Sequence, residues 1–157
     1  MDSQLQEQLV NLLDRIAIQD TICAVTLHSD LNEPVRQYSR DAVIDYSSVT
    51  GPEFANISIQ DHRDNLMKFL PGFDRRQHQV TNFEITVNGD EASARSQARA
   101  VHFIGEECWD IGAVYTHTLR RTLNGWRIVY QKADLVYQTG ESLIEVAKAR
   151  VSTQRKR

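Results

Sequence analysis

The chain has 157 residues, of which 41% are hydrophobic and 25% charged, with a formal net charge of −3. A mildly acidic chain lacks the basic surface that phosphate binding needs, which argues against a nucleic-acid partner. The apolar runs span only a few residues, and the N-terminus has neither the basic start nor the apolar core of a secretion signal. We therefore expect one soluble, cytoplasmic domain over residues 1–157, with no membrane partner.

The N-terminal third of the chain has helical periodicity, first on one apolar stripe and then on a shifted face. The shift predicts a bend or two consecutive helices, with Asp14 capping the second. The pattern ends near Asp30, and Pro34 suits the first turn of a short helix that runs to Tyr38. The first stripe comprises Leu5, Leu9, Leu12, Leu13 and Ile16, and the second Ile18, Ile22 and Val25.

The remainder of the chain is mostly β in character. Residues 41–47 alternate like a strand, and residues 58–70 form a helix that ends at Pro71-Gly72. Four strands follow at 78–87, 91–104, 109–121 and 126–137, with Asn-Gly turns at 88–89 and 124–125. A helix at 142–150 and a basic, frayed tail close the chain. We expect the core to span about residues 9–140, with the C-terminal helix and tail at 141–157.

This order predicts an α+β fold, in which a curved antiparallel sheet carries helices on one face. Strand phase indicates which side chains face the helices, because residues two apart share a face. Small residues dominate that face of the second long strand, where they leave room for a helix or a ligand. The inward sets are Ala92, Ala94, Ser96, Ala98, Ala100 and His102, and then Trp109, Ile111, Ala113, Tyr115, His117 and Leu119.

Four residues are candidates for chemistry, and each has an ordinary structural alternative. Asp30 lies where a helix ends, so it is a candidate acid or the cap of the next helix. His78 starts a strand and His102 lies on the small-residue face; either is a proton carrier or a hydrogen-bonded structural residue. Tyr46 is a hydrogen-bond donor to a carbonyl or a packing residue.

The other candidate groups give weaker signals. His28 would point away from Asp30 on a helix, His62 lies among charged residues on a solvated helix face, and His117 has no partner in sequence. We find no nucleophile motif, phosphate loop or metal-ligand spacing, and the histidines with Asp30 match no zinc pattern. Cys23 and Cys108 fit no disulfide framework, so we expect two reduced, buried thiols and no metal.

Several segments resemble those of SnoaL-like proteins in the nuclear transport factor 2-like superfamily. They are Leu13-Asp14-Arg15-Ile16-Ala17-Ile18-Gln19-Asp20 leading to Asp30, Tyr38 followed by Asp41-Ala42-Val43-Ile44-Asp45-Tyr46, and Gly125-Trp126-Arg127-Ile128. The likeness covers roughly residues 9–140. It implies a cone-shaped, cystatin-like α+β barrel, in which a mostly antiparallel sheet wraps around the N-terminal helices and leaves a pocket at the open end.

Within that group the chain is similar to scytalone dehydratase and, more distantly, to the dehydrochlorinase that acts on lindane. Ile44-Asp45-Tyr46-Ser47-Ser48 resembles the dehydratase segment with a catalytic tyrosine, and Gln77-His78 its Gln-His pair. The resemblance implies catalytic roles for Asp30, His78, Tyr46 and His102. It departs at Ser29, where the dehydratase has a second tyrosine. The substrate-binding serine and asparagine of the dehydratase are replaced here by Ala113 and Tyr115. We expect these two residues and Trp109 to contact substrate.

The resemblance implies a lyase without a cofactor, which removes a proton α to a carbonyl and expels water from a small, hydrophobic, polyketide-like or terpenoid-like ring. An isomerase or polyketide cyclase would use the same residues, and a hydrophobic-ligand-binding domain would need only apolar walls. The likeness also implies a homo-oligomer, a trimer in preference to a dimer. The outward phase of Val101 and Phe103 is consistent with such contacts.

Overall fold

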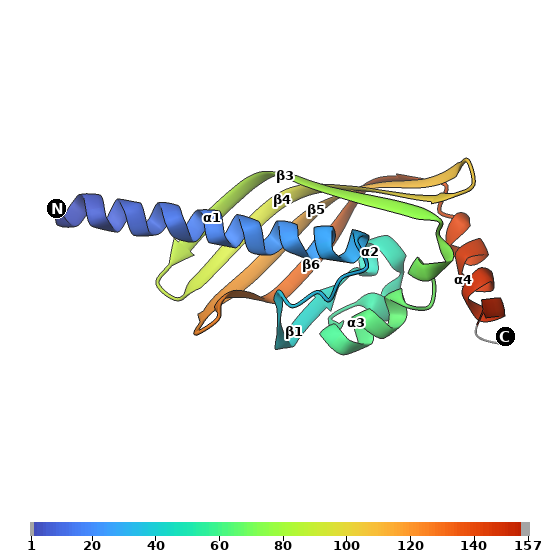
Figure 1. Cartoon of the computed structure of the whole chain (residues 1–157), viewed down its shortest axis with the longest axis horizontal. Helices are drawn as coiled ribbons and strands as arrows, with labels where there is room; N and C mark the ends of the chain where they lie inside the picture. The colour runs from blue at the N-terminus through green and yellow to red at the C-terminus, as the bar shows by residue number, and fades with distance from the viewer. Residues whose placement is uncertain (1, 155–157) are drawn as a thin grey trace.

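One long helix precedes a six-stranded sheet in the computed structural model, which describes residues 2–154 (Figure 1). In chain order the elements are α1 (Ser3–Asp30), β1 (Tyr38–Asp45), α2 (Ser47–Thr50), η1 (Pro52–Phe54), β2 (Ile57–Ser58), α3 (Ile59–Leu66), η2 (Leu70–Gly72), β3 (Arg75–Asn88), β4 (Glu91–Ile104), β5 (Glu107–Thr122), β6 (Gly125–Thr139) and α4 (Leu143–Gln154).

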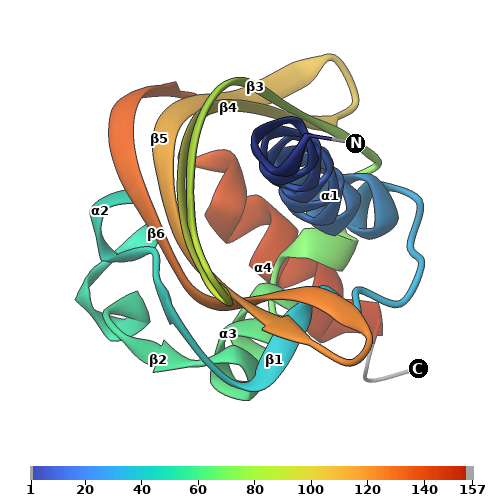
Figure 2. The ribbon, with the colours of Figure 1, turned by 90° about the vertical axis from the view of Figure 1, so that its left-hand side faces the viewer.

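The strands lie in the order β2-β1-β6-β5-β4-β3. All neighbours pair antiparallel except β1 and β6, which are parallel. Figure 2, which looks along α1, shows the sheet curling around that helix, with α3 and α4 also on its concave side. The predicted α+β fold is therefore confirmed. The sheet stays open, with β2 and β3 at its two edges, rather than closing into a barrel.

Helix α1 is continuous over 28 residues, so the predicted bend and second cap at Asp14 are wrong. The apolar face shifts for a different reason. Ile18 and Ile22 face the sheet and are buried, whereas the first stripe points away from it; Leu12, for example, is 53% exposed. Figure 1 shows the first turns of α1 projecting beyond the end of the sheet. All five residues of the stripe are at least 44% exposed.

Asp14 anchors α1 to the sheet instead of capping a helix. Its two carboxylate oxygens accept hydrogen bonds from Nη1 and Nη2 of Arg121, both at 2.7 Å. The indole Nε1–H of Trp126 donates to the same carboxylate at 3.2 Å. Burial raises the pKa of Asp14 less than the hydrogen bond from Arg121 lowers it, so the pKa lies below its usual value and the carboxyl is ionised at neutral pH.

The inward faces of β4 and β5 follow the predicted phase, and all their predicted members are buried. At one end of β4, Ala92 and Ala94 pack in a cluster with Ile18 and Ile22 of α1. At the other end, Ala98 and Ala100 line a cavity. The row of small residues therefore receives the helix at one end of the strand and leaves space at the other.

Two predicted helices differ from those in the structure. Residues 34–37 form no helix, because this segment joins the sheet: the Gln37 carbonyl accepts a hydrogen bond from the Ile128 N–H at 2.9 Å. The helix predicted from residue 58 is capped by Ser58, but it ends at Leu66, and a separate turn, η2, precedes the sheet. The predicted basic tail, residues 155–157, lies outside the described residues.

Helix α4 packs against η2 at a point where only glycine fits. A Cβ atom on Gly72 would lie 2.2 Å from the carbonyl oxygen of Ala147. Leu143 and Ala147 of α4 join a buried cluster with Phe73 and Trp109. This contact closes the end of the concave face at which the predicted site residues lie.

Candidate active site

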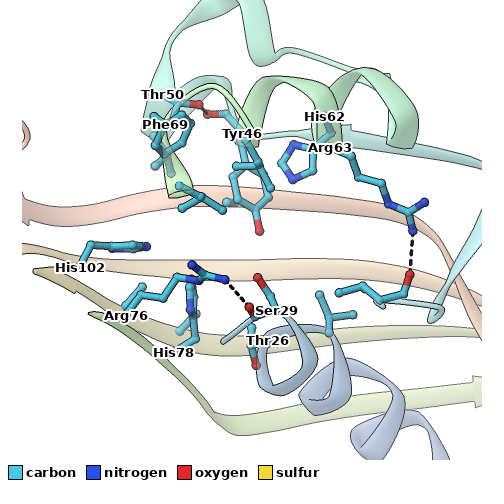
Figure 3. A pocket seen from close by; sticks show the side chains of 18 of the residues that line it. Thr26, Ser29, Tyr46, Thr50, His62, Arg63, Phe69, Arg76, His78 and His102 are labelled. Atoms are coloured by element: carbon cyan, nitrogen blue, oxygen red, sulfur yellow. Dashed lines mark hydrogen bonds between the residues drawn. The ribbon is translucent and has the colours of Figure 1, made fainter. Parts of the chain in front are cut away.

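A cavity of about 710 Å³ lies inside the curve of the sheet, bounded by the C-terminal half of α1, by α2 and α3, and by β4 and β5. Its volume is typical of small-molecule sites, which are concave and mostly apolar with a few polar groups. Figure 3 shows polar side chains from several elements pointing into it. Its apolar wall includes Val49, Leu66, Phe69, Leu70, Ile111 and Ala133.

Asp30 and His78 meet at the inner end of this cavity, although 48 residues separate them in sequence. Asp30 is the last residue of α1, and His78 lies on the edge strand β3. Asp30 Oδ1 is 2.7 Å from His78 Nδ1, and Asp30 Oδ2 accepts a hydrogen bond from the His78 main-chain N–H, also at 2.7 Å. The two side chains are about one-seventh exposed, at 13% and 16%.

The protonation state of this pair follows from the carboxylate. Burial raises the pKa of Asp30. The hydrogen bonds and charge of His78, together with the charge of the nearby Arg76, lower it by a larger amount, so the pKa lies below its usual value. An ionised carboxylate can only accept hydrogen bonds, so Nδ1 of His78 carries the proton. In the neutral ring Nε2 is then the basic nitrogen, and it bonds to no residue within 2–154. His78 lines the cavity.

His102 lies beside this pair but is not bonded to Asp30. Its ring stacks on Trp109 with centroids 4.6 Å apart and meets the His78 ring edge-on at 5.3 Å. It is 2% exposed, and Nδ1 has no hydrogen-bond partner among the described residues. Burial, followed by the charge of His78, lowers the pKa of His102 to about 3. A ring that is neutral at working pH can orient His78 but cannot act as an imidazolium acid.

Tyr46 faces His78 from the opposite wall, and its hydroxyl points into the cavity (Figure 3). Gln131 Nε2 donates a hydrogen bond to this hydroxyl at 2.6 Å, while Gln131 Oε1 accepts one from Tyr38 at 2.5 Å. Because the Tyr46 oxygen accepts from Gln131, Gln131 does not use the proton of Tyr46, which can go to the neighbouring Tyr115 hydroxyl or to a ligand. Burial, and then the neighbouring Tyr115, raise the pKa of Tyr46, so it remains a neutral donor.

The three predicted substrate contacts, Ala113, Tyr115 and Trp109, all line the cavity. Their side chains lie on the inward face of β5, at 7%, 7% and 3% exposure. The ring of Tyr115 is tilted against that of Tyr46, with the ring centroids 6.1 Å apart. All seven predicted site residues are therefore near one chamber; six of them line it, and Asp30 stands behind His78.

The prediction that His62 lies on a solvated face is wrong. His62 is 4% exposed, and its ring meets that of Tyr46 edge-on with the ring centroids 4.8 Å apart. The reason is that Ile59 and His62, three residues apart on α3, share the buried face of that helix. Burial lowers the pKa of His62 to about 4. His62 is therefore a neutral ring in the cavity wall.

Sequence reasoning missed Arg76, Gln131 and Tyr38. Arg76 lies two residues before His78 on β3 and shares its inward phase, so strand alternation could have found it. Gln131 and Tyr38 carry no such signal, because their contact depends on the parallel pairing of β1 with β6.

Residues 2–154 contain no group of three or more histidine, cysteine or acidic side chains placed to hold a metal ion. Both cysteines are free thiols, and each is half-buried rather than buried as predicted, because the adjacent residue takes the buried face, Ile22 beside Cys23 and Trp109 beside Cys108. In the same range, no helix is both long and apolar enough to span a membrane.

Comparison with known proteins gives one family match and many structural likenesses. The model of the SnoaL-like domain matches residues 10–132. The Kfla4162 protein of Kribbella flavida is 26% identical with a TM-score of 0.77, over 85% of this chain and 97% of that one. None of the curated proteins matches the chain.

Two solved structures whose names state an activity share the fold. A provisionally named scytalone dehydratase of Novosphingobium aromaticivorans is 21% identical with a TM-score of 0.68, over 82% of this chain and 88% of its own. A hexachlorocyclohexane dehydrochlorinase of Novosphingobium barchaimii is 22% identical with a TM-score of 0.67, over 84% and 92%. Because the family model covers most of the chain, the protein belongs to the SnoaL-like family.

Proposed function

We propose that the protein is a lyase without a cofactor, a dehydratase that removes a proton α to a carbonyl and expels a β-hydroxyl as water from a small cyclic substrate. The observation that supports it most is the contact between Asp30 and His78, which leaves Nε2 of the ring as the basic atom beside an apolar cavity. Likeness to a dehydratase and a dehydrochlorinase supports the same reaction class, since both names describe eliminations.

The residues divide the reaction into two proton transfers. His78 Nε2 takes the α-proton, and Asp30 stabilises the resulting imidazolium through Nδ1–H, as carboxylates do for catalytic histidines. The C–H electron pair becomes an enolate, whose oxygen accepts a hydrogen bond from Tyr46. When the enolate collapses, the C–O bond to the β-hydroxyl breaks, and the proton on His78 leaves with that oxygen as water.

Neutral His102 gives this scheme a specific feature. Because its pKa is lowered to about 3, it has no proton to give as a cation, so His78 must serve as base and then as acid. Its ring contacts with Trp109 and His78 suit a residue that holds the base in place. One group can perform both transfers if the α-proton and the leaving hydroxyl lie on the same face of the substrate.

The test is product analysis with a β-hydroxy cyclic ketone such as 3-hydroxycyclohexanone in deuterated water. A dehydratase gives the conjugated enone, seen by ultraviolet absorption and by the mass loss of one water. An isomerase or cyclase, the second candidate, would exchange the α-proton for deuterium and keep the oxygen. Binding without exchange or product, in a panel of such ketones with and without a carboxylate on the ring, would contradict the proposal and favour a ligand-binding domain.

A further inference from the structure

Arg76 places a positive charge in the wall of the cavity. It lies on β3 two residues before His78, and both side chains point to the concave side of the sheet. Figure 3 shows its guanidinium between His78 and the hydroxyl of Tyr46. The side chain is only 14% exposed, so the charge is largely shielded from bulk water.

The protein leaves much of this guanidinium without hydrogen-bond partners. Nη2 donates to the Ser29 carbonyl at 2.5 Å and to the Asn32 side-chain oxygen at 2.6 Å, and both acceptors are uncharged. Nε is buried with no partner, and Nη1 donates to no residue in the described range. Asp30 Oδ1 lies 3.9 Å from Nε, beyond hydrogen-bond distance, and is already bonded to His78.

Three of the five N–H donors of Arg76 are thus unpaired next to a cavity. A buried donor without an acceptor is costly, which applies to Nε, and a guanidinium pairs best with carboxylate or other anionic oxygens. The apolar walls strengthen such a pair, because the local dielectric is low. The arrangement suits a ligand that supplies the missing acceptor.

Other charges around the cavity do not replace that ligand. The carboxylate of Asp30 is not part of the cavity wall, because it lies behind His78. Glu33 lines the wall, but its side chain is 54% exposed and close to His28. Arg63 lies by the exposed side and donates to the Val35 carbonyl at 2.8 Å. Arg76 is therefore the shielded cation of the chamber.

We propose that Arg76 binds an anionic oxygen of the substrate, a carboxylate or a phenolate, so that the protein acts on small cyclic acids in preference to neutral ketones. The inference rests on the proposed function only in taking this cavity as the substrate site. It makes Arg76 a specificity-determining residue. The anion held there would set the ring between the His78 base and the Tyr46 donor.

Binding of two isosteric probes, measured by calorimetry without turnover, tests the proposal. Benzoate carries the anion and benzamide does not. Wild-type protein should bind benzoate at least about tenfold more tightly, since a hydrogen bond to a charged group contributes about one order of magnitude or more. Arg76→Met should abolish this preference, and Arg76→Lys should retain part of it. Arg63→Met is the matched control and should keep the full preference.

Equal binding of the two probes to wild type, or a preference that survives in Arg76→Met, would overturn the proposal. Should Arg76→Met fail to fold, the Arg76 Nε–H resonance of the wild-type protein decides instead. This resonance should shift with benzoate and not with benzamide. The absence of a shift with benzoate, or an equal shift with benzamide, refutes the assignment. The two proposals can fail separately: a benzoate preference in a wild-type protein that shows no turnover leaves the anion site standing and rejects the dehydratase.

Discussion

The carboxylate of Asp30 holds His78 at two points, the ring Nδ1 and the main-chain N–H of the same residue, each at 2.7 Å. The second bond uses an N–H on the edge strand β3, so the end of α1 is fixed to the sheet at the same place where it orients the imidazole. Ring tautomer, ring direction and helix position are therefore set by one side chain.

Removing either member of this pair should reduce turnover and leave the fold intact. We expect Asp30→Asn and His78→Gln each to lower kcat by about 10²–10⁴-fold, the usual contribution of a positioned acid or base. Steady-state kinetics measures the loss, and circular dichroism checks the fold. His28→Gln, a partly exposed ring two residues from Asp30, is the control and should behave like wild type. Near-normal turnover in either dyad variant would contradict the pair's role.

Loss of the Tyr46 hydroxyl should affect the transition state more than binding. Tyr46→Phe keeps the ring and removes the proton that Gln131 leaves free, so we expect kcat to fall by about 10²–10³-fold with a small change in KM. Tyr38→Phe removes the hydroxyl on the other side of the same glutamine and is the matched control. If both variants lose the same activity, the network is structural and Tyr46 is not the oxyanion donor.

Acid should destabilise the protein through its buried imidazoles. His62 and His117 have pKa values lowered from 6.5 to about 4, and His102 to about 3, in each case chiefly by burial. Because the unfolded chain takes up these protons first, stability is full above about pH 6.5. It falls as pH drops toward 4, by up to about 1.4 kcal/mol per pH unit for each ring.

Urea unfolding at several pH values measures this slope. His117 is 1% exposed, and His117→Gln should make the fall between pH 6.5 and 4 shallower. An unchanged slope in His117→Gln would show that this ring is not a source of the acid sensitivity. Carboxylates such as Asp30, whose pKa values lie below 3.8, act only at still lower pH.

The link between Asp14 and Arg121 should contribute to stability rather than to catalysis. Asp14→Asn weakens two charge-assisted hydrogen bonds and the bond from Trp126, and we expect it to lower the free energy of unfolding by about 1–3 kcal/mol. Chemical denaturation measures the change, and kcat should stay near wild type. Asp41→Asn disrupts an exposed pair with Arg120 and should have no measurable effect. Equal losses in the two variants would refute the anchoring role.

Local sequence pattern predicted the strands well, because alternation of period two and the turn glycines are local signals. Gly89 and Gly125 lie at turns with φ of 61° and 87°, where the left-handed backbone favours glycine. The inward phase of His102 and Trp109 followed from the same alternation. Helix α1 was misread, because the exposed stripe near Leu12 looks like a core face and only contact with the sheet distinguishes it from Ile18.

The site was less accessible to local reasoning, because its contacts join distant segments. Asp30 and His78 came together only through family resemblance, since nothing in either segment specifies the other. Arg76 was overlooked although its phase matches that of His78, because arginine on a strand usually faces solvent. Gln131 could not be recognised, because its two tyrosine partners come from the same distant strand region and meet it only in the folded sheet.

The small residues on β4 have a consequence for how this scaffold can change its ligands. Ala92 and Ala94 hold α1, while Ala98 and Ala100 border the cavity, so one strand separates the two tasks by position. A larger side chain at Ala98 or Ala100 takes volume from the chamber and does not touch the seat of the helix. Ligand size can therefore evolve, or be engineered, by substitutions at one end of the strand that leave the seat of the helix in place.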